Sequence, residues 1–375
     1  MKRVKKALET AVAEGVFPGA VLLVGLKGEI AFLGAYGCRR LYPRVEAMTP
    51  NTVFDLASLT KVLATTSVIM LLTQAGTVSL EDYIVKYLPL PAESDKKEIT
   101  LKHLLSHSAG LPFWRPYYLE LETSGLLGKK EAAQELVLER CALEGLRFRP
   151  GARSHYSDLD FILLGAIAER ASGRALDAFC REEIFHPLDL KAIGFLPIRF
   201  GAQCSASGPD SWNSGFSLDI AATEDCPWRR RVLCGEVHDE NAYALGGVAG
   251  HAGLFSTAED IYALAWVLLS AYKGKEGLFR PSNVRPFFTR QRDIPGSTWA
   301  LGWDTPSSES SSAGRYFSAN SVGHLGYTGT SLWMDLERSL VVVLLTNRVH
   351  PSRDNTKLKA FRPWIHDLIF EELSC

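Results

Sequence analysis

A serine followed three residues later by a lysine can form a nucleophile and its proton-transfer partner when both lie on one face of a helix. This spacing occurs three times in the chain, at Ser58–Lys61, Ser94–Lys97 and Ser270–Lys273. Chance alone yields about one or two such pairs in a chain of this length. The position of each pair along the chain must therefore distinguish them.

Local context favours Ser58. Ser94 falls in a charged linker that would not fix its rotamer, and Ser270 lies near the end of a predicted helix, where the dipole opposes a negative oxygen. Ser58 opens a long apolar segment, 59–74, which is predicted to be a helix ending at Gly76. Its free N–H groups favour negative charge at the hydroxyl. On this context alone, a simple helix N-cap explains Ser58 equally well.

Two further motifs offer partners for this pair. A third group is usually needed to pass on the serine proton, and Tyr156, in Tyr156-Ser157-Asp158, follows a turn and precedes a predicted helix. A packed aromatic is the ordinary alternative for such a tyrosine. The second motif is His324-Leu325-Gly326-Tyr327, next to a predicted strand, where glycine allows a substrate to approach the backbone.

The surrounding pattern predicts strands at both ends of the chain and helices in the middle. Strands are expected at 20–24, 29–36, 331–335 and 339–346, and helices at 1–16, 59–74, 101–106, 161–171, 258–272 and 358–373. The predicted fold class is therefore α/β of the α+β type: an antiparallel sheet built from both chain ends, flanked by helices, with an inserted all-α region. The expected division is 1–60 plus 250–375, and a mainly helical 61–249 with an irregular loop at 199–240.

Composition excludes several other classes. The 375 residues are 46% hydrophobic with a net charge of −1, and no basic run predicts a nucleic-acid partner. Apolar runs such as Leu340–Leu345 are too short to span a membrane, and the N-terminus lacks a secretory pattern, so we expect a cytoplasmic protein. His103 and His107, four residues apart, lack the glutamate of a zinc-binding helix. No metal or organic cofactor is predicted. The seven cysteines are scattered and form no C-x-x-C pair. The oligomeric state stays open.

Together these motifs resemble the penicillin-recognising serine hydrolases of the class C β-lactamase type. That superfamily includes D-alanyl-D-alanine carboxypeptidases, other penicillin-binding proteins and β-lactamase-like esterases. The resemblance covers nearly the whole chain, and its three marks occur in the family's order: Ser58-x-x-Lys61, Tyr156-x-Asp158, and His324-x-Gly326 where many members have Lys-Thr-Gly. Stretches 103–112 and 246–256 look like the same family. Five ordered marks weigh strongly against the N-cap reading of Ser58.

The resemblance implies a role for each residue. Ser58 attacks a carbonyl and becomes acylated, while Lys61 and Tyr156 shuttle the proton. The backbone N–H groups of Ser58 and Tyr327 form the oxyanion hole, and His324 and Gly326 border the substrate. The implied fold, with a site between an α/β domain and an all-α region, agrees with the pattern above.

The chain departs from the family pattern at two positions. Asp158 stands where Asn is frequent, and its carboxylate favours the charged form of Lys61. We therefore hypothesise that Tyr156 carries more of the base role, with Lys61 as the cation that lowers its pKa. His324 replaces a fixed cation, which favours ester or peptide-like substrates over β-lactams.

The predicted function is hydrolysis of a small-molecule ester or amide through a Ser58 acyl-enzyme, most simply by an esterase of the β-lactamase-like type. The alternatives are a β-lactamase or D-Ala-D-Ala carboxypeptidase and, from another class, a catalytically silent binding protein on this scaffold. The roles of His238 and His251 stay open, with a structural role favoured for His251. Four aromatic residues are candidates for an acyl pocket: Trp114, Tyr117, Tyr118 and Trp212.

Overall fold

A six-stranded antiparallel sheet joins the two ends of the chain. The computed structural model describes residues 1–91, 93–198 and 219–373. The strand order is β3-β2-β1-β11-β10-β9, with bounds β1 Gly19–Leu26, β2 Glu29–Arg40, β3 Glu46–Ala47, β9 Ser321–Leu325, β10 Ser331–Asp335 and β11 Leu340–Thr346. Strands β1 and β11 pair in the middle, with Leu22 opposite Leu344. The predicted sheet from both chain ends is confirmed.

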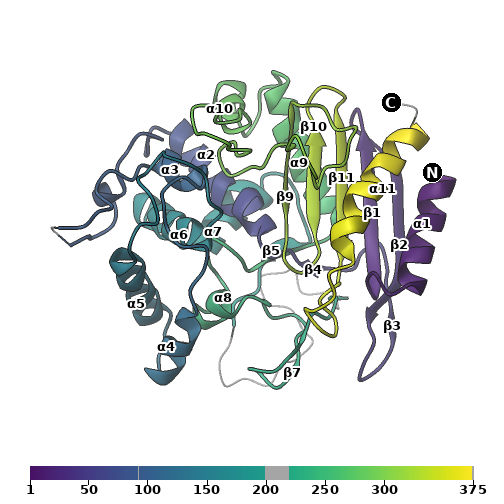
Figure 1. Cartoon of the computed structure of the whole chain (residues 1–375), viewed down its shortest axis with the longest axis horizontal. Helices are drawn as coiled ribbons and strands as arrows, with labels where there is room; N and C mark the ends of the chain where they lie inside the picture. Colours follow the sequence, from purple (N-terminus) through teal and green to yellow (C-terminus); the bar gives the residue numbers. More distant parts are fainter. Residues whose placement is uncertain (92, 199–218, 374–375) are drawn as a thin grey trace.

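Helices cover both faces of this sheet (Figure 1). Helices α1 (Lys2–Ala13) and α11 (Leu358–Leu373) pack together on one face, and α9 (Ala258–Tyr272) packs against β1 and β11 on the other. Leu22 belongs to the core under α1 and α11, whereas Leu23 belongs to the core on the α9 side. Burial on both faces explains why β1 and β11 are continuously apolar rather than alternating.

The middle of the chain is mainly helical. Its α-helices are α2 Ser67–Gln74, α3 Leu101–Leu105, α4 Tyr117–Thr123, α5 Lys130–Leu143, α6 Asp158–Ser172, α7 Leu176–Cys180, α8 Glu240–Ala244 and α10 Pro281–Phe287. Shorter helical turns are η1 Lys61–Thr66, η2 Ile84–Lys86 and η3 Arg181–Phe185. Small strands are β4 Phe54–Asp55, β5 Ile193–Phe195 and β8 Leu254–Ser256 in one sheet, and β6 Asp225–Cys226 with β7 Arg231–Val232 in another.

Local details differ from the sequence-based expectation. The helix predicted over 59–74 contains a π-helical stretch at Lys61–Thr66, a widening that often accompanies functional sites. Helix α3 ends at Leu105, so His107, with a φ of +53°, does not share a helix with His103. His324 lies within edge strand β9 rather than next to a strand.

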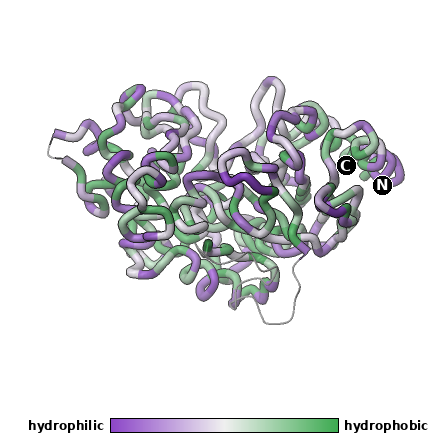
Figure 2. Tube along the Cα trace, turned by 90° about the horizontal axis from the view of Figure 1, so that it is seen from below, coloured by the Kyte–Doolittle hydropathy of each residue, from purple (hydrophilic) through white to green (hydrophobic). Residues whose placement is uncertain are grey.

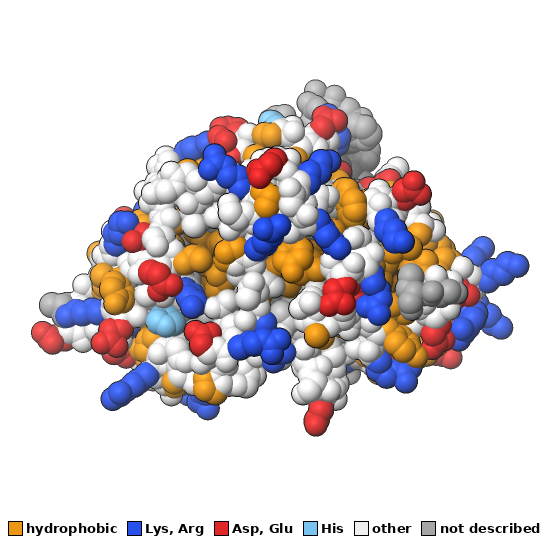
Figure 3. Space-filling model, turned by 90° about the horizontal axis from the view of Figure 1, so that it is seen from above, with side chains coloured by type: hydrophobic (Ala, Val, Ile, Leu, Met, Phe, Trp, Pro, Cys, Tyr) orange, Lys and Arg blue, Asp and Glu red, His pale blue; other side chains and the backbone are white. Residues whose placement is uncertain are grey.

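The surface carries both signs of charge. On the face shown in Figure 3, acidic and basic side chains are interspersed, so neither sign dominates. Along the chain trace in Figure 2, hydrophobic and hydrophilic residues alternate within many helices, as expected for helices with one buried face. None of the helices in the described ranges is long and apolar enough to cross a membrane.

Candidate active site

A sharp turn presents Ser58 at the start of the helical segment. Strand β4 ends at Asp55, and Ala57 adopts a φ of +46°, which is rare for a residue with a side chain. The buried Asp55 carboxylate accepts the Ala57 N–H at 2.9 Å and so holds this turn. Ser58 itself remains partly exposed. Its hydroxyl is therefore reachable while its backbone is fixed.

Lys61 is fully buried and makes three hydrogen bonds. Its Nζ lies 2.9 Å from Ser58 Oγ, 2.6 Å from Asp158 Oδ1 and 3.0 Å from the His251 carbonyl oxygen. An ammonium has three N–H bonds, and these three acceptors use all of them. The geometry is that of a charged lysine anchored beside the serine.

Tyr156 is the second residue whose side chain contacts the serine hydroxyl. Its hydroxyl lies 2.8 Å from Ser58 Oγ. Ser157 follows as the N-cap of α6, accepting the N–H of Asp160, and this cap fixes the chain just after the tyrosine. The structure therefore brings Ser58, Lys61, Tyr156 and Asp158 together, although they come from segments about 100 residues apart.

The protonation states follow from burial and charge. Burial favours neutral Lys61, but the adjacent Asp158 carboxylate outweighs it and raises the pKa of Lys61. Burial raises the pKa of Tyr156 to about 12, although the Lys61 charge acts to lower it. The expected charged state of Lys61 agrees with this. The Lys61 charge acts on the pKa of Tyr156 in the expected direction, but desolvation of the phenol outweighs it.

His324 lies on β9, on the sheet side of the site. Its ring is buried, and Nδ1 lies 2.8 Å from the Leu325 carbonyl oxygen, to which it donates. Burial and the Lys61 charge lower the pKa of His324 to about 3, so the imidazole is neutral at pH 7. Unlike a lysine at this position, it offers no fixed positive charge.

The turn after β9 docks onto the segment that precedes the serine. Thr328 Oγ1 donates to the Asp55 carbonyl at 2.8 Å, and Thr330 Oγ1 donates to the Leu56 carbonyl at 3.0 Å. A Cβ at Gly326 would lie 2.5 Å from the Leu56 carbonyl oxygen, so only glycine allows this approach. Within the described ranges, the backbone N–H groups of Ser58 and Tyr327 have no acceptor, which leaves both available to a substrate oxygen.

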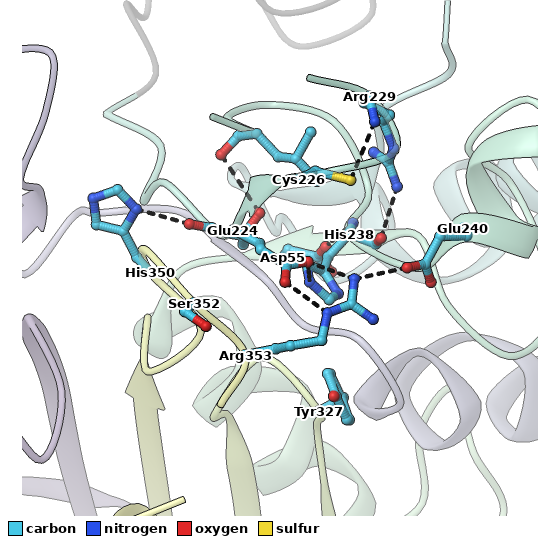
Figure 4. Close-up of polar contacts among 12 residues, drawn as sticks. Asp55, Glu224, Cys226, Arg229, His238, Glu240, Tyr327, His350, Ser352 and Arg353 are labelled. Carbon is cyan, nitrogen blue, oxygen red and sulfur yellow. Dashed lines mark hydrogen bonds and ion pairs between the residues drawn. The ribbon is translucent and has the colours of Figure 1, made fainter. Parts of the chain in front are cut away.

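A polar network that the sequence did not reveal supports the Tyr327 turn (Figure 4). The His238 ring stacks on the Tyr327 ring at 5.7 Å, and the backbone N–H of His238 donates to Asp55 Oδ2 at 2.6 Å. His238 Nε2 lies 3.0 Å from Glu224 Oε2, and Arg353 binds the same carboxylate. Glu224 and Arg353 are 129 positions apart, so no local pattern could have paired them.

Arg348 holds the same turn from the C-terminal side. It donates to the Tyr327 carbonyl at 2.6 Å and to the carbonyls of Arg353 and Asn355 at 3.0 and 2.8 Å. Its guanidinium also lies 4.9 Å from the centre of the Tyr327 ring. The proposed oxyanion donor therefore sits on a backbone that is braced on two sides.

His251 combines two contacts beside Lys61. Besides the carbonyl contact with Lys61, its Nε2 lies 2.9 Å from Asp239 Oδ1. The structural role expected for His251 agrees with these contacts.

The aromatic residues predicted to form an acyl pocket do not all lie in one group. Tyr117 is buried against Cys141, whereas Tyr118 packs against Trp114 and Trp228, with ring centres 6.4 and 4.6 Å away. Trp212 lies outside the described residues. An aromatic residue missed from the sequence, the exposed Phe113, has its ring 5.7 Å from that of Tyr156.

We expect the contacts of Glu224 with His238 and Arg353 to make the protein less stable in acid. Burial alone would raise the pKa of Glu224, but the bonds from His238 and Arg353 lower it to about 2. A lowered pKa means that the stabilisation is complete above the ordinary value of 4.5 and is lost as pH falls from there toward 2. We expect the free energy of unfolding, measured in urea, to decrease over this range.

In Glu224→Gln, the free energy of unfolding should decrease less steeply with falling pH than in the wild type. Replacing the exposed Glu276 by Gln should leave the wild-type slope unchanged. Equal slopes for wild type and Glu224→Gln would show that this carboxylate does not titrate with folding.

Comparisons with known proteins place the chain in a family. The family model described as Beta-lactamase matches residues 4–362. The "N-acetylmuramyl-L-alanine amidase" of Bacillus subtilis (strain 168) is 33% identical over 371 residues, covering 93% of this chain and 81% of the relative. The "Putative D-alanyl-D-alanine carboxypeptidase" of Escherichia coli (strain K12) is 32% identical over 351 residues, covering 89% of this chain and 79% of the relative.

The fold has counterparts among solved structures. The structure described as "EstCE1, a hydrolase with promiscuous acyltransferase activity" superposes with a TM-score of 0.71 at 21% identity, covering 96% of this chain and 98% of that one. The resemblance read from the motifs is thereby confirmed at the level of family and fold. The chain belongs to the beta-lactamase family and is a serine hydrolase with that family's fold.

Proposed function

We propose that this hydrolase cleaves an ester or amide bond through an acyl-enzyme on Ser58, in the manner of class C β-lactamases and their relatives. The observation that carries the proposal is the position of Ser58 Oγ, 2.9 Å from Lys61 Nζ and 2.8 Å from the Tyr156 hydroxyl. Both distances allow direct proton transfer. The pair is thus more than a helix cap, since a cap needs neither partner.

Tyr156 is the better proton acceptor of the two. The Lys61 ammonium has no free electron pair, and Asp158 stabilises its charge. In the reactive form, the Tyr156 phenolate takes the Ser58 proton as Ser58 Oγ bonds to the substrate carbonyl carbon. The N–H groups of Ser58 and Tyr327 stabilise the resulting oxyanion. The Tyr156 phenol then donates its proton to the leaving alkoxide or amine as the carbon–heteroatom bond breaks.

Deacylation repeats these steps with water as the nucleophile. Tyr156 takes a proton from the water, the tetrahedral intermediate forms at the same oxyanion site, and the proton returns to Ser58 as the acid leaves. Lys61 stays charged throughout and stabilises the phenolate by its proximity, with Nζ 5.1 Å from the ring centre. Its role is electrostatic in both halves of the reaction.

The charges around the site favour substrates without a carboxylate beside the scissile bond. The Lys61 charge is already paired with the Asp158 carboxylate, and His324 is uncharged. Neither residue therefore provides the positive partner that a β-lactam or a C-terminal carboxylate needs. An ester fits this environment. An amide within a larger molecule fits it as well, and the similarity to the Bacillus subtilis amidase favours that second candidate.

A labelling experiment tests the proposal. A fluorophosphonate probe should modify Ser58, located by peptide mass spectrometry, and Ser58→Ala should abolish the labelling. Failure of the wild-type protein to label would favour the catalytically silent alternative.

A substrate panel then separates the activities. Short and long p-nitrophenyl esters, an N-acetylmuramyl-L-alanine amide, a D-Ala-D-Ala peptide and nitrocefin should be compared by kcat/KM, with Ser58→Ala as the blank. We expect the ester or the internal amide to lead. Fast nitrocefin turnover beside slow ester hydrolysis would overturn the charge argument.

A further inference from the structure

One histidine holds the backbone on both sides of Tyr156. The carbonyl oxygen of His107 accepts the His155 N–H at 2.7 Å, and its ring Nδ1 accepts the Ser157 N–H at 3.3 Å. The His107 ring also packs against the Tyr156 ring, with centres 4.6 Å apart. Three contacts with one residue therefore fix where the phenol points.

His107 is itself held in a strained and fully enclosed position. Its φ of +53° is unusual for a residue with a side chain and persists only where the surroundings enforce it. The Trp299 ring packs edge-on at 4.5 Å, and the Asp160 Oδ2 lies 2.9 Å from His107 Nδ1. Asp160 stands in the first turn of α6, whose cap is Ser157. His107, Asp160 and Ser157 thus contact one another, and together they hold the chain next to Tyr156.

Hydrogen-bond geometry locates the proton between His107 and Asp160. The Ser157 N–H can bond only to an unprotonated Nδ1, and an unprotonated Nδ1 can bond to Asp160 Oδ2 only if that carboxyl is protonated. Burial and the nearby Asp158 charge raise the pKa of Asp160 well above its usual range. Burial, the Lys61 charge and two neighbouring histidines, His324 and His155, lower the pKa of His107 well below its own. Both directions agree with a pair that carries no charge.

We infer that His107 and Asp160 form an uncharged hydrogen-bonded pair that positions Tyr156 for proton transfer to and from Ser58. The inference rests on the proposed function and adds two positioning residues to it. Absence of charge matters because the His107 ring packs against Tyr156 and contacts Asp160, and a carboxylate at that distance would oppose the phenolate that the reaction needs. The pair also fixes the phenol close to the serine, where a shift of about 1 Å can cost about 10²-fold in rate.

Replacing Asp160 tests the charge of the pair. Asp160→Asn keeps an uncharged donor toward His107 Nδ1, so kcat should stay within about threefold of wild type, whereas Asp160→Leu, which removes the donor, should lower kcat by about 10²-fold. KM should change little in either variant, since neither residue is expected to touch substrate. Equal losses in both variants would show that a carboxylate charge is required and would overturn the inference.

Replacing His107 tests the positioning itself. His107→Phe keeps a ring but removes the acceptor for Ser157, and should lower kcat by about 10²-fold with KM nearly unchanged. His366→Phe is the matched control, because His366 is equally buried and one of its ring nitrogens is bonded to the Ala313 carbonyl. Its other ring nitrogen has no partner among the described residues. It should lose stability without losing kcat. Normal kcat in His107→Phe would overturn the inference.

Hydrogen exchange separates this inference from the proposed function. The Ser157 amide loses its acceptor and should exchange faster in His107→Phe than in wild type or His366→Phe, whereas the His155 amide keeps the backbone carbonyl of residue 107 as its acceptor. This readout requires no activity. Unchanged exchange at the Ser157 amide would overturn the positioning role. If wild-type Ser58 cannot be labelled by the fluorophosphonate, the proposed function fails, and exchange still decides whether His107 holds Tyr156.

Discussion

Replacing Lys61 with methionine is expected to lower kcat by about 10³-fold or more, because the charge that stabilises the Tyr156 phenolate is lost. The same change should lower the free energy of unfolding by about 3–5 kcal/mol, since it leaves the largely buried Asp158 carboxylate without its partner. Steady-state kinetics on the best ester of the panel and urea denaturation at pH 7 measure the two losses.

A double variant distinguishes catalysis from stability. In Lys61→Met/Asp158→Asn both charges are gone, and an uncharged buried pair is often as stable as the ion pair it replaces. Most of the unfolding free energy should therefore return while kcat stays low. Recovery of kcat together with stability would mean that Lys61 acts only as a structural anchor.

The fold was largely predictable because its elements carry strong local patterns. The helices 258–272 and 358–373 were predicted with the bounds that the structure shows for α9 and α11. Their apolar positions recur with helical spacing over four turns, which fixes both type and extent. Strands β10 and β11 were also predicted within one residue, since continuous β-branched and apolar runs bounded by turn residues leave few alternatives.

The candidate site was predictable only in its central part. Ser58, Lys61 and Tyr156 carry motifs with family order, and the structure brings them within hydrogen-bond distance; their catalytic roles stay a prediction. The supporting residues have no such signature. Glu224 pairs with Arg353, and Asp160 with His107, through contacts set by tertiary packing rather than by any spacing along the chain.

Conformation at single residues also escaped prediction. The π-helical stretch at Lys61–Thr66 and the left-handed backbone of Ala57 and His107 oppose local preference. Such departures arise where tertiary contacts outweigh propensity, and these three lie beside the serine or beside Tyr156. The raised pKa of Tyr156 escaped prediction for a related reason, since the sequence shows the neighbouring lysine but not the desolvation of the phenol.

Replacing Tyr156 with phenylalanine is expected to lower the acylation rate by about 10²- to 10⁴-fold, the range for loss of a general acid–base group. KM should change little, because the phenol acts mainly in the transition state. Burst-phase kinetics with a p-nitrophenyl ester measure acylation directly. Near-normal acylation in Tyr156→Phe would show that Lys61 is the base after all.

The pH dependence of kcat/KM in the wild-type protein tests independently whether Tyr156 is the base. With the pKa of Tyr156 at about 12, the phenolate fraction grows with pH, so kcat/KM should rise up to pH 10 without reaching a plateau. In Asp158→Asn, Lys61 loses the anion that raises its pKa, and burial then favours the neutral amine. Lys61 becomes able to accept the serine proton, and a plateau should appear at lower pH.

Combining the two changes measures how far the base role is shared. If Asp158 is what keeps Lys61 from acting as a base, then Tyr156→Phe should cost less in the Asp158→Asn background than in wild type. The difference between the two costs is the coupling energy of a double-mutant cycle. Equal costs in both backgrounds would mean that Tyr156 keeps the base role whatever the charge of Lys61. A smaller cost would identify Asp158 as the residue that moves proton transfer from the lysine to the tyrosine.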